Sequence, residues 1–117
     1  MTTAALKYSL IDAKTLKAKL DNKESFQLWN VLTTQYYKAE ANIPGSQWLP
    51  VDSLTEKLTS EKAPKKDELI VTYCGGLKCP SSKQAADKLV SLGYSNVFAF
   101  EGGLEEWLGA GFPVVKL

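Results

Sequence analysis

The chain contains no histidine and no arginine, so all 14 of its basic residues are lysines. The absence of histidine excludes a Ser/His or Cys/His nucleophile pair and every His-ligated metal site. The absence of arginine excludes the bidentate contacts by which a guanidinium group binds phosphate or carboxylate. Chemistry in this protein must therefore rest on cysteine, lysine, serine, carboxylates and backbone dipoles.

The chain also has little net charge, few cysteines and no long apolar run. The 117 residues carry a net charge of +1 and 2 cysteines. Nucleic-acid and membrane-surface proteins show a basic patch, which this balance does not favour, and no apolar run approaches the ~20 residues that cross a bilayer. The first ten residues lack the apolar core of a signal peptide. We therefore expect a cytoplasmic protein with no nucleic-acid and no membrane partner.

What the chain does contain is typical of one globular domain. Hydrophobic residues make up 44% of it, which is ordinary for a folded protein and too much for a disordered one. No repeat, low-complexity block or long linker divides it, so we expect a single domain over residues 1–117. Two cysteines cannot build a disulfide-rich scaffold, and we expect neither a metal nor a cofactor.

Helical and β-rich patterns alternate along the chain. Asp12 is expected to cap a first helix, with Ile11 and Leu16 forming a hydrophobic staple across its start. Ser81 or Ser82 is expected to cap a later helix. The other expected elements are strands over 26–32, 69–74 and 97–100, helices over 54–58 and 104–110, a turn at 42–46 and a polar, solvated connection at 59–68. Strands that alternate with helices predict an α/β domain with a parallel sheet.

The clearest chemical signal is the strand, Gly-rich loop and helix around Cys74. Ligand sites of open α/β sheets collect at the carboxyl ends of parallel strands, where Cys74 lies. The glycines that follow allow successive N–H groups to form an anion nest, and the positive end of the next helix points to the same place. These effects are expected to lower the pKa of Cys74 and make it a nucleophilic thiolate. Lys78 is expected to add a positive charge at the rim.

The same residues also have plain structural interpretations. Cys74 is alternatively a small buried residue that ends a core strand. A Gly-rich loop also suits phosphate, but this one lacks the Gly-Lys-Ser/Thr ending of a P-loop. Cys79 is either a loop residue without chemistry or a redox or resolving thiol, because a curled loop brings Cα atoms within the roughly 7 Å that a disulfide needs. Pro80 fixes the backbone after Cys79 and weighs against that pairing.

Several segments, in order along nearly the whole chain, resemble a single-domain rhodanese, a small sulfurtransferase-like domain. Residues 42–46 (Asn-Ile-Pro-Gly-Ser) resemble the family's His-Ile-Pro-Gly-Ala segment, and residues 71–74 (Val-Thr-Tyr-Cys) resemble the strand that ends at its active-site cysteine. Residues 85–97 resemble the helix and strand that follow, and residues 101–114 its carboxyl-terminal signature. The resemblance implies a rhodanese-like α/β fold in which helices flank both faces of a central parallel sheet.

The resemblance also implies a chemistry. Members of the family transfer a sulfane sulfur through a persulfide on the active-site cysteine, which matches Cys74. A ring of loop amides suits the delocalised charge of a persulfide. The implied partners are a small sulfur-containing anion such as thiosulfate or polysulfide as donor, and cyanide, a thiol or a thiol-bearing protein as acceptor. The expected substrate-binding residues are Gly75, Gly76, Leu77, Lys78 and Cys79.

Three departures from the family pattern bear on this interpretation. Residues 30–32 (Asn-Val-Leu) stand where many catalytic members have Asp-Val-Arg, and Asn42 stands at the usual His. The loop after Cys74 lacks the Arg of the common Cys-x-x-Gly-x-Arg-Ser and is two residues longer. It resembles the loop of a rhodanese-like subgroup with a second cysteine five positions on, here Cys79. A longer loop predicts a wider pocket, which favours a substrate other than thiosulfate.

Three functions were weighed against these residues. The first is a sulfurtransferase that acts through a Cys74 persulfide. The second is a non-catalytic rhodanese-like module that binds a partner protein or senses redox state, which the lost Asp/Arg pair favours and the retained Cys74 opposes. The third, a Cys-dependent phosphatase or arsenate reductase, needs a loop Arg for its oxyanion, and Lys78 does not supply the bidentate contact. The sequence-based prediction is the first of these.

Overall fold

The computed structural model describes residues 8–58 and 63–116. Residues 59–62, which belong to the predicted polar connection, lie outside the described residues. Residues 1–7, where the sequence has no apolar run, also lie outside them. The strands are β1 (Ser9–Leu10), β2 (Gln27–Asn30), β3 (Gln47–Trp48), β4 (Ile70–Tyr73) and β5 (Val97–Phe100). The helices are α1 (Ala13–Asp21), the 3-10 turn η1 (Val51–Ser53), α2 (Leu54–Leu58), α3 (Ser81–Ser91) and α4 (Gly103–Gly109).

The strands form one parallel sheet in the order β1-β5-β4-β2-β3. Strand β4 lies in the middle, and all 4 of its residues are buried. The predicted α/β fold with a parallel sheet is confirmed. Strands β1 and β3 were not predicted, because segments of 2 residues are too short to show a period-2 pattern.

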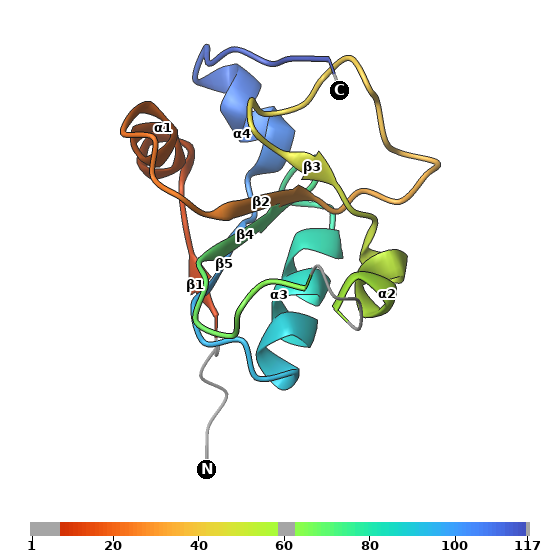
Figure 1. The fold of residues 1–117 in the computed structure, drawn as a ribbon. Helices are drawn as coiled ribbons and strands as arrows, with labels where there is room; N and C mark the ends of the chain where they lie inside the picture. Colours follow the sequence, from red (N-terminus) through yellow and green to blue (C-terminus); the bar gives the residue numbers. More distant parts are fainter. Residues whose placement is uncertain (1–7, 59–62, 117) are drawn as a thin grey trace.

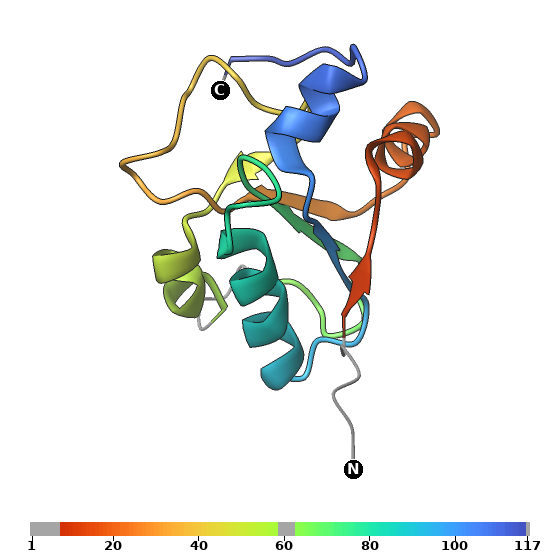
Figure 2. The ribbon, with the colours of Figure 1, turned by 180° about the vertical axis from the view of Figure 1, so that it is seen from behind.

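Helices cover both faces of the sheet, as predicted. Figures 1 and 2 show α1 and α4 on one face and α2 and α3 on the other. Strand side chains alternate between faces, so Val71 and Tyr73 pack in the core under α1 and α4, while Ile70 and Cys74 pack in the core on the α3 side. Cys74 directly follows β4 on the same face as Ile70, so its thiol is directed toward the start of α3. None of the helices in the described part of the chain combines the length and apolarity that a bilayer crossing needs.

The predicted start of the first helix is confirmed. The Asp12 carboxylate accepts a hydrogen bond from the Thr15 amide at 2.8 Å, and Ile11 and Leu16 are buried in the same core cluster. Strand β2 is shorter than predicted and ends at Asn30. Its side-chain oxygen accepts from the Leu32 amide at 3.0 Å, and such a local bond takes the backbone out of the ladder.

The predicted capping role of Ser81 and Ser82 is wrong. Helix α3 begins at Ser81, its N-cap is Pro80, and no side chain caps it. Both serines lie instead inside the first turn, where the Ser82 side chain is buried. The structural reason is that this turn packs against the loop that follows β4, so the two hydroxyl groups face the cysteine thiols rather than the helix end.

Candidate active site

Cys74 directly follows β4 and is held by the start of α4. The Cys74 carbonyl accepts from the Leu104 amide at 2.9 Å, and the Gly75 carbonyl accepts from the Glu105 amide at 2.9 Å. Gly103 makes this approach possible, because its φ is +55° and a Cβ there would lie 2.2 Å from the Cys74 carbonyl oxygen. The first residue of α4 is therefore a glycine that allows the helix to approach the end of β4 and the cysteine that follows it.

The loop after Cys74 curls back over its thiol. The Cys79 amide donates to the Gly76 carbonyl at 3.0 Å, which closes a turn. The Cys74 thiol donates to the Cys79 carbonyl, with 3.4 Å between Sγ and O. Both cysteines are free thiols, but Cys74 is fully buried at 0% exposure while Cys79 is half-buried. The second cysteine thus lies between the first one and the surface.

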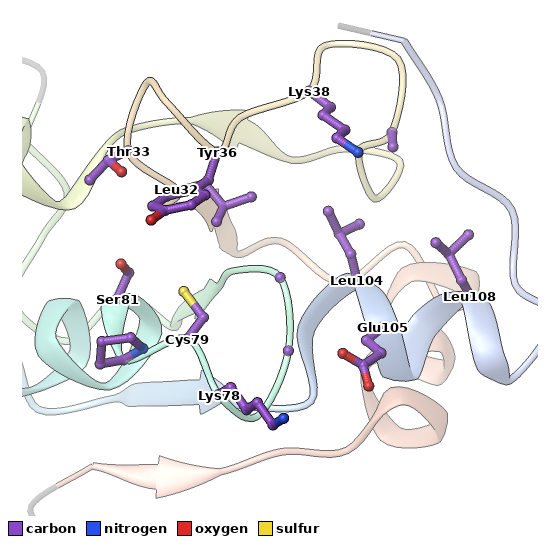
Figure 3. A pocket seen from close by; sticks show the side chains of 14 residues that line it. Leu32, Thr33, Tyr36, Lys38, Lys78, Cys79, Ser81, Leu104, Glu105 and Leu108 are labelled. Atoms are coloured by element: carbon purple, nitrogen blue, oxygen red, sulfur yellow. The ribbon is translucent and has the colours of Figure 1, made fainter.

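A pocket of about 920 Å³ opens beside this loop, and Cys79 lines it while Cys74 does not. Figure 3 shows the Cys79 sulfur pointing into the cavity, toward the side chains that follow β2. Three stretches of chain supply the walls: residues 32–41, the loop and α3 start at 75–81, and one side of α4 at 104–108. The apolar lining comes from Leu32, Tyr36, Ala41, Pro80, Leu104 and Leu108.

The predicted binding residues are not all at this pocket. Gly75, Gly76, Lys78 and Cys79 line it. Leu77 does not, because it stands at the loop tip with 66% of its surface exposed. The Lys78 side chain runs along the outside of the loop in Figure 3, so its ammonium group points away from the Cys79 sulfur.

The two thiols differ in acidity, and the direction predicted for Cys74 is wrong. Burial raises the pKa of Cys74, and the neighbouring Cys79 thiol raises it further, against a smaller lowering by the Ser82 amide and hydroxyl. Burial also raises the pKa of Cys79, but hydrogen bonding from Cys74, the Ser81 amide and hydroxyl and the Gly75 amide outweighs it. The pKa of Cys79 therefore lies below its ordinary value. Of the loop amides that were expected to serve Cys74, the Gly75 amide acts on Cys79 instead, and the Cys79 amide donates to the Gly76 carbonyl.

Ser82 places a buried hydroxyl group beside the Cys74 thiol. Its hydroxyl is the one buried side-chain group among the described residues that makes no well-aligned hydrogen bond. Its carbonyl accepts from the Thr72 hydroxyl at 2.8 Å, which ties the first turn of α3 to β4. A buried hydroxyl without a well-aligned partner costs free energy, and this one lies close enough to the Cys74 sulfur to lower the pKa of that thiol.

The departures from the family pattern at Asn30 and Asn42 turn out to be partners. The Asn30 amide donates to the Asn42 side-chain carbonyl at 2.8 Å, and both residues are buried. The Asn42 amide donates in turn to the carbonyls of Lys38 and Ala39, each at 3.1 Å. A neutral pair buries no charge and needs no counterion. It anchors the segment after β2 that forms one wall of the pocket.

Sequence reasoning missed the outer walls of the pocket. Leu104 and Leu108 are four residues apart on α4, so helical spacing would have placed them on one face. Tyr36 and Lys38 belong to an irregular segment without periodicity, and no signal in the sequence brings them to the loop. Across residues 8–58 and 63–116, no group of three or more His, Cys, Asp or Glu side chains is arranged to hold a metal ion.

The comparisons with known proteins agree with the fold. The rhodanese-like domain model matches residues 12–110. A protein of Bacillus halodurans has a TM-score of 0.80 at 28% identity, over 92% of this chain and 77% of its own. The human single-domain sulfurtransferase has a TM-score of 0.75 at 25% identity, over 86% and 95%. A thiosulfate sulfurtransferase of Pseudomonas aeruginosa has a TM-score of 0.79 at 26% identity, over 92% of this chain and 20% of its own. No curated protein matches the chain.

Proposed function

The chain belongs to the rhodanese-like domain family, and on that premise we propose that it transfers a sulfane sulfur through a persulfide formed in the loop after β4. The observation that carries the proposal is a pair of free thiols in one loop, one of which lines a pocket, with amide and hydroxyl donors directed at its sulfur. Two structural neighbours are named sulfurtransferases, which supports the same activity. The family position points to Cys74 as the cysteine that carries the sulfur, whereas Cys79 is the cysteine that lines the pocket. The proposed activity requires only that one of the two forms the persulfide.

The reaction consists of two displacements at sulfur. A loop thiolate attacks the outer sulfur of the donor, a new S–S bond forms, and the donor's own S–S bond breaks, so that thiosulfate leaves as sulfite. A thiolate or cyanide acceptor then attacks the outer sulfur of the persulfide, and the loop thiolate is released. The persulfide anion is stabilised by fixed donors around it, since such donors need no reorganisation when the charge arrives.

The pocket supports a donor or acceptor larger than thiosulfate. Its volume of about 920 Å³ and its leucine and tyrosine walls suit an organic group attached to the sulfur. Lys38 and Lys78 are the cations on its lining, and Glu105 is the carboxylate. This mixture favours a substrate whose apolar part is buried while its anionic part stays near the rim.

Intact-mass measurement tests the proposal. Incubation with thiosulfate or polysulfide is expected to add about 32 Da, the mass of one sulfur carried as a persulfide, and cyanide is expected to remove it as thiocyanate. The control is the double variant Cys74→Ser/Cys79→Ser, which keeps the loop but has no thiol. A parent protein that gains no sulfur, or a double variant that gains as much, would contradict the proposal and leave the non-catalytic module as the better interpretation.

A further inference from the structure

We propose that the Ser82 hydroxyl donates a hydrogen bond to the charged sulfur of Cys74, and that Thr72 is the positioning residue that holds Ser82 in place. This inference rests on the proposed function, because it concerns the charge that Cys74 bears when it attacks a donor or carries a persulfide. Neither Thr72 nor Ser82 lines the pocket. Their contribution to sulfur transfer therefore passes through Cys74.

Ser82 is the polar member of the buried face of α3. The buried residues of this helix are Ser82, Ala85, Ala86 and Leu89. Their spacing of three and four residues puts them on one side of the helix. The three apolar members belong to the same core cluster as Cys74, and Ser82 stands in the first turn, where it acts on the Cys74 thiol. The helix thus presents a hydroxyl to the cysteine where the rest of this face presents apolar groups.

The Ser82 hydroxyl is free to serve a charge at Cys74. It is fully buried, and within residues 8–58 and 63–116 it is the buried side-chain group that lacks a well-aligned hydrogen bond. Such a group costs free energy in the resting protein. A hydroxyl hydrogen rotates about the C–O bond, so it turns toward a negative charge that develops beside it. An unsatisfied buried donor next to a reactive sulfur therefore has a use during the reaction.

Ionisation of Cys74 creates the need for this donor. The Cys74 thiol donates its proton to the Cys79 carbonyl, with 3.4 Å between Sγ and O, and a carbonyl oxygen only accepts. Loss of the proton breaks this bond and leaves a negative sulfur at a fully buried position. Burial raises the pKa of Cys74, whereas the Ser82 amide and hydroxyl act in the opposite direction. A hydrogen bond from Ser82 therefore offsets part of the penalty that burial imposes on the thiolate.

Thr72 fixes Ser82 relative to the cysteine. Its hydroxyl donates to the Ser82 carbonyl at 2.8 Å, and both residues are fully buried. Thr72 precedes Cys74 by two residues, and side chains at this spacing point to the same face of a sheet. The bond therefore joins the first turn of α3 to the strand that leads to the cysteine. Valine has nearly the same shape as threonine, so packing alone does not call for a hydroxyl at this position.

The Ser82 hydroxyl keeps its proton throughout the reaction. The Cys74 thiolate forms an S–S bond to the outer sulfur of thiosulfate, the donor's own S–S bond breaks, and the electron pair leaves with sulfite. The persulfide carries the same single negative charge that the thiolate carried. Because Cys74 starts as a neutral thiol, a donor that favours the charged sulfur lowers the free energy of every state after ionisation.

Titration of Cys74 tests the hydrogen bond without any sulfur donor. The proteins carry Cys79→Ser, so that one thiol remains, and the cysteine Cβ is isotope-labelled because its NMR shift follows ionisation and needs no access from solvent. Ser82→Ala is expected to titrate at a higher pH than the Cys79→Ser protein. Ser91→Ala is the matched control and should titrate unchanged, since Ser91 is exposed at the other end of α3. An unchanged titration in Ser82→Ala would overturn the proposal.

A double variant tests the positioning role of Thr72. Thr72→Val is expected to shift the titration in the same direction by a smaller amount, and Thr72→Ser is expected to remove the shift because serine keeps the hydroxyl. If Thr72 acts through Ser82, the variant Thr72→Val/Ser82→Ala titrates like Ser82→Ala alone. Summed shifts in the double variant, or no shift in Thr72→Val, would rule out this role. Urea unfolding verifies that each variant is folded over the pH range.

The rate of sulfur loading links the hydrogen bond to the reaction. In the Cys79→Ser protein at neutral pH, Ser82→Ala is expected to gain sulfur from thiosulfate about tenfold more slowly, because a hydrogen bond to a charged group contributes at least that factor. Ser91→Ala should load at the unchanged rate. An unchanged rate in Ser82→Ala would overturn the inference and leave the proposed function intact.

Two further outcomes separate the inference from the proposed function. Loading of the unaltered protein without loading of the Cys79→Ser protein would make Cys79 the carrier and overturn the inference alone. An unaltered protein that gains no sulfur would overturn the proposed function itself. The titrations would then still decide whether Ser82 bonds to the Cys74 sulfur, because they use no sulfur donor.

Discussion

Exposure separates two cysteines that belong to one short loop. Both thiols lie near the start of α3 and near amide groups that favour negative charge, but only Cys79 lines the pocket. Burial penalises a charged thiol, and this penalty is larger where water is fully excluded. The pKa of Cys74 is therefore raised, whereas hydrogen bonds to the Cys79 thiol lower the pKa of Cys79. The extra residues of the loop place the second sulfur between the donors and the solvent.

Mild oxidation with hydrogen peroxide is expected to join Cys74 and Cys79 in a disulfide. The thiols interact in the reduced protein, and the loop between them has room to adjust, since a Cβ at Gly75 would meet no atom within 4 Å. Intact mass should fall by about 2 Da as two thiols become one S–S bond, and dithiothreitol should restore it. Peptide mapping that finds both thiols separately alkylated after oxidation would contradict this prediction, and Cys79→Ser provides the control.

Lys78 is expected to contribute little to substrate binding. Its side chain is exposed, and its ammonium group points away from the Cys79 sulfur. Exposed charge pairs contribute only about 0.2–1 kcal/mol, so Lys78→Ala should raise KM for thiosulfate by no more than about threefold at low salt and leave kcat unchanged. The effect should vanish in high salt. Lys65→Ala, at an exposed lysine that does not line the pocket, is the matched control. A tenfold rise in KM would mean that the side chain turns into the pocket.

Contacts between elements hold the strand end in position. Strand β4 is buried between β2 and β5, so its own place in the sheet is set by pairing on both sides. The start of α4 then packs on its carboxyl end through the amides of Leu104 and Glu105. The cysteine loop is thereby fixed at both sides, at β4 and at the start of α3, while its tip at Leu77 remains exposed.

Gly103→Ala is expected to destabilise the protein and distort the loop. A Cβ at this position would meet the Cys74 carbonyl oxygen at 2.2 Å, and the φ of +55° is unfavourable for alanine. Left-handed backbone and overpacking together cost roughly 2–4 kcal/mol, measured as a loss in the free energy of unfolding by urea. Gly109→Ala is the matched control on the same helix, because a Cβ there meets no atom within 4 Å. That variant should remain within about 0.5 kcal/mol of the parent or be more stable. Equal stabilities for the two variants would contradict the steric role of Gly103.

The pocket is a property of the whole molecule. Its walls come from residues 32–41, 75–81 and 104–108, which are far apart in the sequence and meet because β2 and β4 are neighbours in the sheet and α4 packs on the end of β4. The Asn30–Asn42 pair holds the first of these segments. The width of the pocket therefore depends on three separate parts of the fold rather than on the loop alone.

An apolar donor is expected to bind better than a small one of the same charge. Benzenethiosulfonate and methanethiosulfonate differ only in the organic group, so their KM values compare apolar burial directly. Full burial of a side chain of phenyl size contributes about 1.5–3 kcal/mol, and partial burial in this pocket should lower KM about tenfold for the aromatic donor. Leu108→Ala should reduce that preference to about threefold, since Leu108 lines the pocket.

Leu92→Ala is the control for this comparison, because Leu92 is an exposed leucine that does not line the pocket. Its KM ratio for the two donors should equal that of the parent. A parent protein that shows the same KM for both thiosulfonates would contradict the view that the apolar walls contact the substrate.

The amino-acid sequence by itself determined the longer elements in their order, without β1 and β3, and pointed to the loop after β4 as the candidate site. The Asp12 cap, the apolar run of β4 and the glycines around residues 75 and 103 are local signals, and each depends on residues only a few positions apart. The element that contains Cys74, the parallel sheet and the helices on both faces followed from these signals and from the family resemblance. The serine caps failed, because packing of the first turn of α3 against the loop overrode the local preference for a capping side chain.

Only the tertiary structure decided which sulfur lines the pocket and which is buried. Exposure, pKa and the shape of the pocket depend on atoms brought together from distant parts of the chain, such as the Leu104 amide on the Cys74 carbonyl and Asn30 beside Asn42. A pattern of neighbours along the sequence carries no record of these contacts, and the loop of this chain departs in length and residue types from the common family loop. Local periodicity therefore placed Cys74 at the end of a strand, whereas long-range packing buried it and left Cys79 at the pocket.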